Sequence, residues 1–433
     1  MNTPIHDFLK EYSNSNTLRL HMPGHKGKYN LHDITEIKGA DSLFEADSII
    51  LDSEKNASKL FNTMATYYST AGSTLSIQSM LFMVKKDGRK LYAIRNVHRS
   101  FLNACVLLDL SVTWIYPNYE NTIISGSVSL QTIKETLLVD SSPKALYITS
   151  PDYYGMVADI KSIAEICHQS NTILLVDNAH GTLLNFLDVN IHPIHLGADM
   201  CSDSAHKMLP VLTGGGYLHI NNSDYVSMGK TAMSFFGSTS PSYLIMESLD
   251  LCNKYIQESL KSDLLRVIEN IQKLKYRFKD KFCFANSKEP LHLTFLTWKT
   301  HQSGLDLANQ LREFNIECEY SDNQSLVLLF SPLDDDVTFT RLSYALDNIH
   351  LVECNTNVDV LNLPRLHSKM SMREAVFSNS ETVPVDSSVN RVCAEVKVPC
   401  PPAIPIAVSG EVISLDCIKI FKNYGINSIN VVK

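Results

Sequence analysis

Between residues 61 and 220, short apolar runs alternate with amphipathic stretches of helical period. Strands that alternate with helices predict a mainly parallel sheet with helices on both of its faces. The runs expected to be strands are 66–70, Lys90–Ile94, 145–149, 172–176, 198–202 and Gly216–Ile220. The helices expected between them are 75–84, 100–108 and Ile160–Gln169, so the fold class is α/β.

A polar residue follows several of these runs, namely His98, Asp152, Asp177 and Ser204. In open α/β sheets, ligands bind in the crevice at the carboxyl ends of the strands. We therefore expect these side chains to face a common site.

The chain has 433 residues, which predicts two or three packed units. Pro23, Gly24 and Gly27 predict an irregular N-terminal segment, and residues 247–279 predict one long helix that leads out of a large domain. The expected division is an arm (1–30), a large domain (31–265), a small α+β domain (266–360) and a C-terminal region (361–433).

The charge balance excludes several classes of protein. With 38 basic and 46 acidic residues the net charge is -8, so no nucleic-acid partner is expected, whereas a cationic small molecule is compatible. No apolar run reaches membrane-spanning length, and the N-terminus does not resemble a signal peptide. The ten cysteines include no CxxC pair. We therefore expect reduced thiols in the cytoplasm and no membrane partner.

Lys207 is the main catalytic candidate. It follows the expected strand 198–202 in the stretch Ser204-Ala205-His206-Lys207. Desolvation beside a buried strand lowers the pKa of an amine and makes it nucleophilic, as a Schiff base with an aldehyde cofactor requires. Ser204 and His206 are suitable donors to a phosphate. Taken alone, the spacing fits a surface lysine after a loop serine better, and the neighbouring motifs are what favour the catalytic interpretation.

Asp177 ends the apolar run 172–176, and His180 follows it closely. A carboxylate at this place can pair with the ring nitrogen of pyridoxal phosphate and keep the ring an electron sink. The alternative is a turn-capping aspartate.

Gly72, Ser73 and Thr74 stand where a helix begins, and backbone N–H groups there bind phosphate, although a plain helix cap has the same sequence. His98 follows another strand and could stack on a cofactor ring or simply occupy a turn. His21 and His25 are four residues apart, but Pro23 and Gly24 break the helix that would align them, so no metal site is expected.

Together these segments resemble the Orn/Lys/Arg decarboxylase family, in its short form. The segments are RLHMPGHKGK, AGST, NVHRS, SPDYYGMVADIKSIAEICHQ, LLVDNAHG, GADMCSDSAHKMLP and a C-terminal block that begins MSMREAVF. The resemblance spans nearly the whole chain. It implies the pyridoxal-phosphate-dependent type I fold of aspartate aminotransferase, with a smaller α+β C-terminal domain.

The resemblance also implies roles for individual residues. Lys207 would hold pyridoxal phosphate covalently, and Asp177 would pair with its ring nitrogen. Ser204, His206, Gly72, Ser73 and Thr74 would hold its phosphate. His98 would stack on the ring, and His180 would lie beside it. Family members build their sites at a subunit interface, so a homodimer or larger homo-oligomer is expected.

The expected reaction is decarboxylation of arginine, lysine or ornithine to the corresponding amine, a step of polyamine biosynthesis, with Lys207 or His206 as proton donor. Glu395, Glu411 and His25 are candidates for the substrate side. An aminotransferase, with Arg373 or Arg391 on the substrate carboxylate, and a cofactor-binding homologue without activity are the alternatives. The family usually has an acidic residue where this chain has Asn178.

Overall fold

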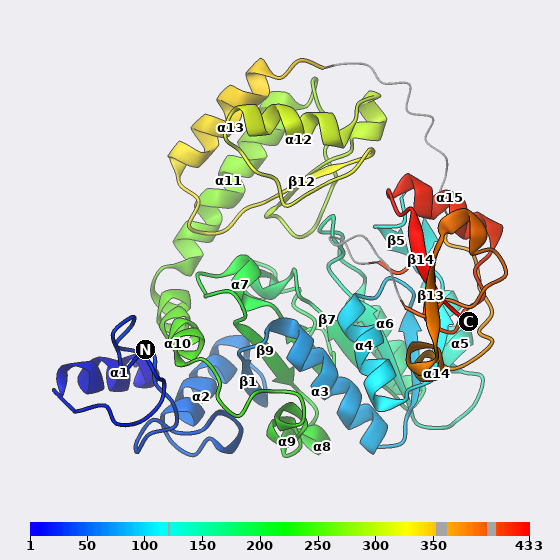
Figure 1. Cartoon of the computed structure of the whole chain (residues 1–433). Coiled ribbons are helices and arrows are strands. Elements are labelled where there is room, and N and C mark those ends of the chain that lie inside the picture. Colours follow the sequence, from blue (N-terminus) through cyan, green and yellow to red (C-terminus); the bar gives the residue numbers. More distant parts are fainter. Residues whose placement is uncertain (120–121, 352–361, 396–403) are drawn as a thin grey trace. The chain divides into compact units, whose positions relative to one another are not determined.

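The computed structural model describes residues 1–119, 122–351, 362–395 and 404–433 (Figure 1). Contacts group the chain into two compact units. Unit 1 comprises Met1–Arg89, Ile160–Gln169 and Ile173–Leu265. Unit 2 comprises Lys90–Asp159, Ser170–Thr172 and Arg266–Lys433. The predicted domain boundary at residue 360 lies outside the described residues.

Unit 1 holds the strands whose ends carry most of the predicted cofactor residues. These strands are β1 (Ala65–Ser69), β7 (Thr172–Asp177), β8 (Met200–Asp203) and β9 (Gly216–Ile220). Its helices are α1 (Pro4–Asn14), η1 (Leu43–Glu45), α2 (Ile49–Phe61), α3 (Gly72–Lys86), α6 (Ile160–Gln169), η2 (Thr182–Phe186), α7 (Ala205–Met208), α8 (Ser223–Val226), α9 (Gly229–Ser234) and α10 (Tyr243–Glu258). Helix α11 (Leu260–Phe278) contains the boundary between the units.

Unit 2 combines α/β segments with the C-terminal third of the chain. Its strands are β2 (Lys90–Ile94), β3 (Val112–Ile115), β4 (Asn118–Tyr119), β5 (Gly126–Ser127), β6 (Lys144–Thr149), β10 (His292–Phe295), β11 (Tyr320–Ser321), β12 (Leu326–Leu329), β13 (Ser380–Pro384) and β14 (Ser428–Val432). Its helices are α4 (Arg99–Leu108), α5 (Leu130–Leu137), η3 (Thr297–Thr300), α12 (Gly304–Glu313), α13 (Asp336–Asn348), α14 (Met372–Phe377), η4 (Val385–Ser387) and α15 (Leu415–Asn423).

The main sheet has the strand order β1-β9-β8-β7-β6-β2-β3. Strand β7 is parallel to β8, and β2 is parallel to both β3 and β6, as the alternation of strands and helices predicts. Strand β9 instead runs antiparallel to both β8 and β1. A parallel return needs a crossover of a dozen or more residues, usually with a full helix. The connection 204–215 has a dozen residues, but its helix α7 spans only Ala205–Met208, so it lacks the full helix of a usual parallel crossover, and β9 returns antiparallel.

The prediction of an irregular segment over residues 1–30 is wrong for its first half, because α1 is a regular helix (blue in Figure 1). Pro4 stands at the start of this helix, where its missing N–H costs nothing. Ile5 and Leu9, four residues apart, are both fully buried. Asp250 on α10 accepts hydrogen bonds from the backbone N–H groups of Ile5 and His6, both at 3.0 Å. This long-range cap gives no local sequence signal.

The helix predicted over 247–279 is divided in two. Helix α10 ends at Glu258 and α11 begins at Leu260, with Ser259 in a non-helical conformation. The carbonyl of Ser259 accepts a hydrogen bond from the Ser262 hydroxyl at 2.9 Å. Serine side chains compete with the backbone for such bonds, which is why serine disfavours helix interiors.

The C-terminal region of unit 2 packs in a hydrophobic core that it shares with other segments of the unit. Phe421 and Ile418 from α15 and Val431 from β14 pack in one buried cluster with Tyr154 and Val327. Strands β13 and β14 pair antiparallel beside it. Among the described residues, no helix combines the length and hydrophobicity that crossing a membrane requires.

Candidate active site

Asp177 and Ser204 lie at the same edge of the sheet in unit 1. Asp177 is the last residue of β7, and its Cα pairs in register with Ser202 of the parallel strand β8. Ser204 follows β8 directly and precedes α7, which carries His206 and Lys207. Asp177 and Ser204 are 2% and 1% exposed. The rule that site residues follow parallel strands therefore holds for this pair.

Lys207 points toward the loop that follows Asp177. Its Nζ lies 2.9 Å from Nε2 of the buried His180. The backbone of this loop is ordered by Asp177, whose Oδ1 accepts a hydrogen bond from the Ala179 N–H at 3.2 Å. The structure thus brings together three of the predicted residues, a half-buried amine, an imidazole and a carboxylate-bearing loop.

The first turn of α3 packs closely on the loop between α7 and β9. The Gly72 N–H donates to the Gly214 carbonyl at 2.7 Å. A Cβ on Gly216 would lie 2.8 Å from the Asp203 carbonyl oxygen and 3.4 Å from the Ser73 nitrogen, so only glycine fits there. Ala71, at the N-cap, gives this helix no side-chain cap. Uncapped N–H groups at the start of a helix suit a phosphate.

His206 lies against this same turn. Its Cε1 would be 3.6 Å from a Cβ placed on Gly72, and its Nδ1–H donates to the Gly215 carbonyl at 2.8 Å. Burial lowers the pKa of His206, and the nearby Lys207 charge lowers it further, while the bond to Gly215 acts in the opposite direction. A neutral imidazole that donates from Nδ1 leaves Nε2 as an acceptor.

A buried charge network beneath this segment was missed by sequence reasoning. Asp203 accepts a hydrogen bond from Asn178 Nδ2 at 2.7 Å, and His192 Nε2 lies 3.0 Å and His219 Nε2 3.4 Å from its carboxylate. Although burial raises the pKa of Asp203, the two imidazoles hold it below its usual range. The network fixes the loop after β7 to the end of β8. The available signal in the sequence was a charged residue, Asp203, at the end of the buried strand 200–203.

The remaining predicted residues occupy other surroundings. His98, in unit 2, is the N-cap of α4 and accepts the Ser100 N–H at 3.1 Å. Glu395 is exposed and accepts the Asn430 amide at 2.6 Å. His25, in unit 1, pairs through Nε2 with Asp33 at 2.9 Å.

Glu411, a candidate for the substrate side, forms a buried ion pair within the protein that the sequence did not suggest. Its Oε2 lies 2.9 Å from Arg95 Nη2, and both side chains are almost completely buried in unit 2. The Val408 N–H donates to the same oxygen at 2.7 Å. Burial raises the pKa of Glu411, and Arg95 opposes that shift.

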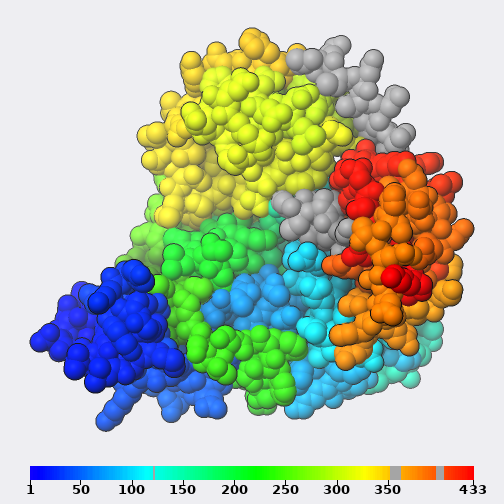
Figure 2. Space-filling model, viewed as in Figure 1, coloured from blue at the N-terminus to red at the C-terminus, as the bar shows by residue number. Residues whose placement is uncertain are grey.

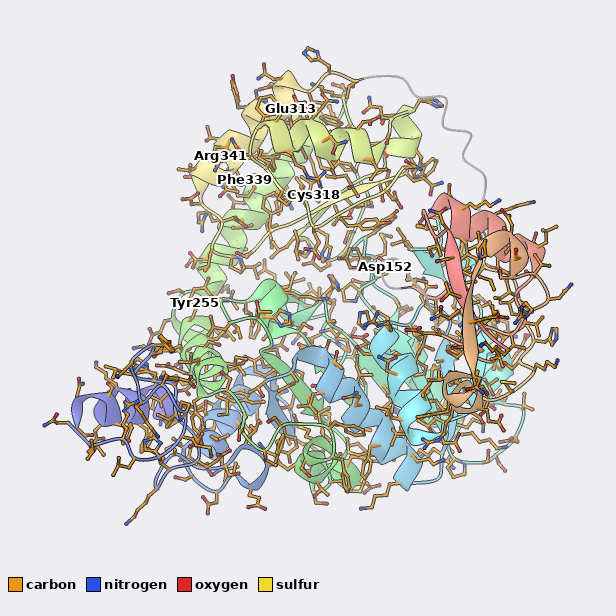
Figure 3. The ribbon with its side chains drawn as sticks, viewed as in Figure 1. Asp152, Tyr255, Glu313, Cys318, Phe339 and Arg341 are labelled. Atoms are coloured by element: carbon orange, nitrogen blue, oxygen red, sulfur yellow. The ribbon has the colours of Figure 1, made fainter. Side chains whose placement is uncertain are left out.

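Asp152, labelled in Figure 3, follows β6 in unit 2. It accepts the Tyr154 N–H at 2.9 Å and the Met156 N–H at 3.0 Å. Burial raises the pKa of Asp152 to about 6. This carboxyl thus organises the turn of the SPDYYG motif, a role that the sequence did not assign to it.

Residues 3–303 match the family described as Orn/Lys/Arg decarboxylase, major domain, and residues 354–424 match its C-terminal domain. The chain belongs to the Orn/Lys/Arg decarboxylase family. The arginine decarboxylase of Bacillus subtilis (strain 168) is 30% identical over 460 residues, covering 97% of this chain and 93% of that relative. The arginine decarboxylase of Bacillus anthracis is 27% identical, covering 96% and 91%.

The fold agrees with this membership. The crystal structure of the Francisella novicida lysine decarboxylase superposes with a TM-score of 0.83 at 18% identity, covering 100% of this chain and 81% of that one. The chain is thus an enzyme, a decarboxylase with the type I fold of pyridoxal-phosphate-dependent enzymes. The resemblance and the fold class inferred from the sequence are confirmed.

Proposed function

We propose that this enzyme uses pyridoxal phosphate to remove the α-carboxyl group of a basic amino acid, and that arginine is its preferred substrate. Several relatives that match over nearly their whole length, among them those of Bacillus subtilis and Bacillus anthracis, are named arginine decarboxylases. The observation that carries the proposal is the Lys207 amine, held 2.9 Å from His180 on the edge of the sheet where Asp177 ends β7.

The residues of unit 1 fit the cofactor. The start of α3 has no side-chain cap, and Ser73 and Thr74 would bind a phosphate there through backbone N–H groups and hydroxyls, next to Gly72, whose own N–H donates to Gly214. Ser204 would hold the phosphate from α7, and His206 would donate to it when its Nε2 is protonated, since its Nδ1–H is already on Gly215. Asp177 would face the ring nitrogen. When bound, pyridoxal phosphate supplies an electron sink for the carbanion that forms as carbon dioxide leaves.

Each of these side chains then has a stated task. Lys207 would hold the cofactor and, with substrate bound, would be placed to return a proton at the α carbon. His180 orients the lysine amine between these two states. His206, as a neutral imidazole, offers Nε2 as an alternative carrier of that proton. Asp177, which is buried, would stabilise positive charge on the group that it faces.

The contacts of two arginines favour decarboxylation over amino transfer. A transaminase needs an arginine that clamps the α-carboxylate. Arg373 donates to the backbone carbonyls of Val106 and Leu107, the latter at 2.9 Å. Arg391 pairs with Glu381 at 2.7 Å. Both guanidinium groups are thus engaged within unit 2.

The direct test is release of carbon dioxide from arginine, lysine and ornithine, measured in parallel with the cofactor-loaded enzyme. We expect release from arginine, with the matching amine as product. A preference for lysine or ornithine would revise the assigned substrate but leave the assigned reaction, decarboxylation, unchanged. Release from none of the three, or formation of a keto acid with 2-oxoglutarate as acceptor, would contradict the proposal.

We further propose that the enzyme is a homodimer or a larger homo-oligomer in the cytoplasm. The segment 18–31, blue in Figure 2, exposes the apolar side chains Leu18, Leu20, Met22, Tyr29 and Leu31. Tyr29 is 91% and Leu20 82% exposed, and an exposed apolar patch of this kind marks an interaction surface. Light scattering should give a dimer mass or more, and Leu20→Asp should lower it. A monomer in the unaltered protein would contradict this.

A further inference from the structure

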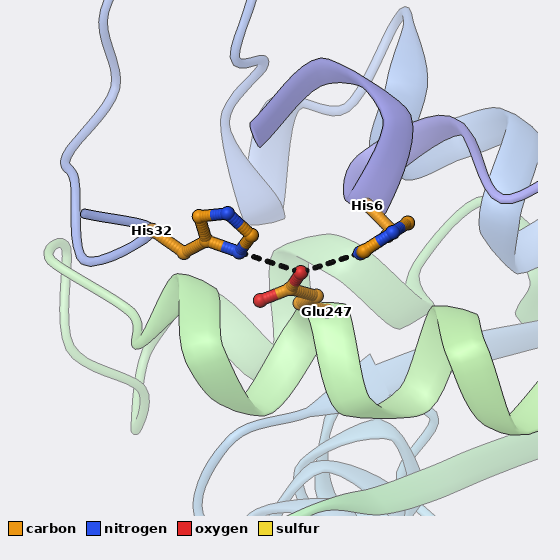
Figure 4. A group of neighbouring side chains, drawn as sticks. All are labelled: His6, His32 and Glu247. Carbon is orange, nitrogen blue, oxygen red and sulfur yellow. Dashed lines mark hydrogen bonds and ion pairs between the residues drawn. The ribbon is translucent and has the colours of Figure 1, made fainter. Parts of the chain in front are cut away.

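Two histidines and a glutamate, far apart in the sequence, meet in unit 1 (Figure 4). The Nδ1 atoms of His6 and His32 lie 2.7 and 2.8 Å from the same carboxylate oxygen, Oε1 of Glu247. All three ligand atoms lie within 4.8 Å of one another. Glu247 is buried, while each imidazole is about a quarter exposed. The site is thus open to solvent on the side of the histidines.

Two of the three side chains are held on regular helices. His6 is in the first turn of α1, and Glu247 lies on α10. Asp250, one turn further along α10, fixes the first turn of α1 through the N–H groups of Ile5 and His6. His6 and Glu247 therefore face each other before anything binds between them, and such preorganisation strengthens a binding site.

The third side chain, that of His32, comes from outside the helices. His32 lies on the turn-rich segment between α1 and η1, where its N–H donates to Asn30 Oδ1 at 2.8 Å. The bond from His32 to Glu247 ties this segment to α10, as does the Tyr243 hydroxyl, which donates to the Asp41 carbonyl at 2.7 Å. An occupant of the site would strengthen that tie.

The donor set suits one class of ion. Two imidazole nitrogens and one carboxylate oxygen are the protein ligands of zinc sites that keep water in the fourth position. Ligand atoms around one tetrahedral zinc lie about 3.3 Å apart, for metal–ligand distances of about 2.0–2.2 Å. The present separations from Glu247 need to open by about half an ångström, which rotation of partly exposed imidazoles allows.

We propose that His6, His32 and Glu247 bind one divalent transition-metal ion, with zinc as the best fit, and that this ion holds residues 15–42 against α10. The site lies apart from Lys207 and does not depend on the proposed reaction. Sequence reasoning expected no metal, because it considered only the histidine pair at 21 and 25. The structure places His21 Nε2 2.7 Å from Tyr12 and His25 Nε2 2.9 Å from Asp33.

The test is titration of the tag-free, cofactor-loaded enzyme with Zn²⁺ by calorimetry, and with Co²⁺ followed by visible absorption. We expect one ion to bind per chain. The matched variant is His6→Asn combined with His32→Asn, because an asparagine amide can donate where Nδ1 did but is a poor zinc ligand. Loss of even outer contacts costs a metal site 10–100-fold in affinity, so this variant should lose at least about a hundredfold.

A second readout separates the metal site from a plain hydrogen-bond cluster. Zn²⁺ should raise the melting temperature of the unaltered enzyme by roughly 2–4 °C. The double variant should melt near the metal-free enzyme and not respond. His168→Asn is the control. His168 is half-exposed, and its Nε2 lies 3.0 Å from Oδ2 of Asp199. This variant should retain full Zn²⁺ binding.

Three results would overturn the proposal. The unaltered enzyme could fail to bind Zn²⁺, or the double variant could bind it equally well. The third is binding that persists in the double variant with thiolate–cobalt absorption, because that would place the ion at the buried group His192, Cys201 and Asp203.

Discussion

The end of β8 in unit 1 and the C-terminal block of unit 2 both bury charged side chains, but they do so differently. Around Asp203, the partners His192, His219 and Asn178 come from neighbouring strands and loops of the sheet. In the C-terminal block, Glu411 is balanced by a single cation, Arg95. Charge shared in a network stabilises a site, whereas a single buried pair stays costly if one partner is removed. The first arrangement supports a cofactor site; the second supports the fold.

The largest expected effect is on the cofactor side of this comparison. Lys207→Ala should lower decarboxylation by at least about 10⁴-fold, as loss of a covalent catalytic residue does, and should abolish the visible absorbance of the bound cofactor. Circular dichroism should remain unchanged. Lys161→Ala, which changes an exposed lysine on α6, should keep both activity and absorbance. Retained turnover in Lys207→Ala would remove this lysine from the mechanism.

Glu411→Gln tests the other side. It leaves Arg95 as an uncompensated buried charge, so unfolding in denaturant should become easier by about 3–5 kcal/mol. Glu395→Gln changes an exposed residue and should alter the free energy of unfolding by less than about 0.5 kcal/mol. A substrate-side role for Glu395 would show as a change in the KM for substrate alone. If Glu411→Gln were as stable as the unaltered enzyme and only its KM rose, Glu411 would face substrate instead of supporting the fold.

Asp177→Asn sharpens the contrast within unit 1. The amide keeps the size of the side chain and its acceptor oxygen for the Ala179 N–H, so the fold and cofactor binding should persist. The carboxylate charge is lost, and turnover should fall by roughly 10²–10³-fold. Steady-state kinetics of the cofactor-loaded variant measure this, and near-normal turnover would show that the ring nitrogen has another partner.

Comparison of these regions also shows what sequence can predict. Lys207, Ser204, Asp177 and His180 lie within a few residues of strands β7 and β8, so local patterns could indicate them as candidates for one site. The strands themselves were predicted within about two residues, because buried runs flanked by breakers are strong signals.

Other features had no local signal. The start of helix α1 is capped by the distant Asp250, and the Glu411–Arg95 pair joins residues 316 positions apart. The direction of β9 goes with a connection that lacks a full helix. Contacts between distant segments decide such features, so only the structure could give them.

The smallest expected effect concerns pH. Burial raises the pKa of Asp250 to about 6, so the folded state binds a proton that the unfolded state releases above about pH 4. This carboxyl therefore stabilises the fold below about pH 4, and that contribution is lost as the pH rises to about 6. Asp250→Asn should remove this dependence, worth at most about 3 kcal/mol. Denaturation midpoints between pH 4 and 7 measure it, with Asp152→Asn as the corresponding test in unit 2.

The most direct test of the central claim is to trap the cofactor on the protein. Borohydride reduction of the cofactor-loaded enzyme, followed by digestion and mass spectrometry, identifies the lysine that carries pyridoxal phosphate. We expect the added mass of the reduced cofactor on the peptide that contains Ser204, His206 and Lys207. The added mass on any other lysine, or on none, would contradict it.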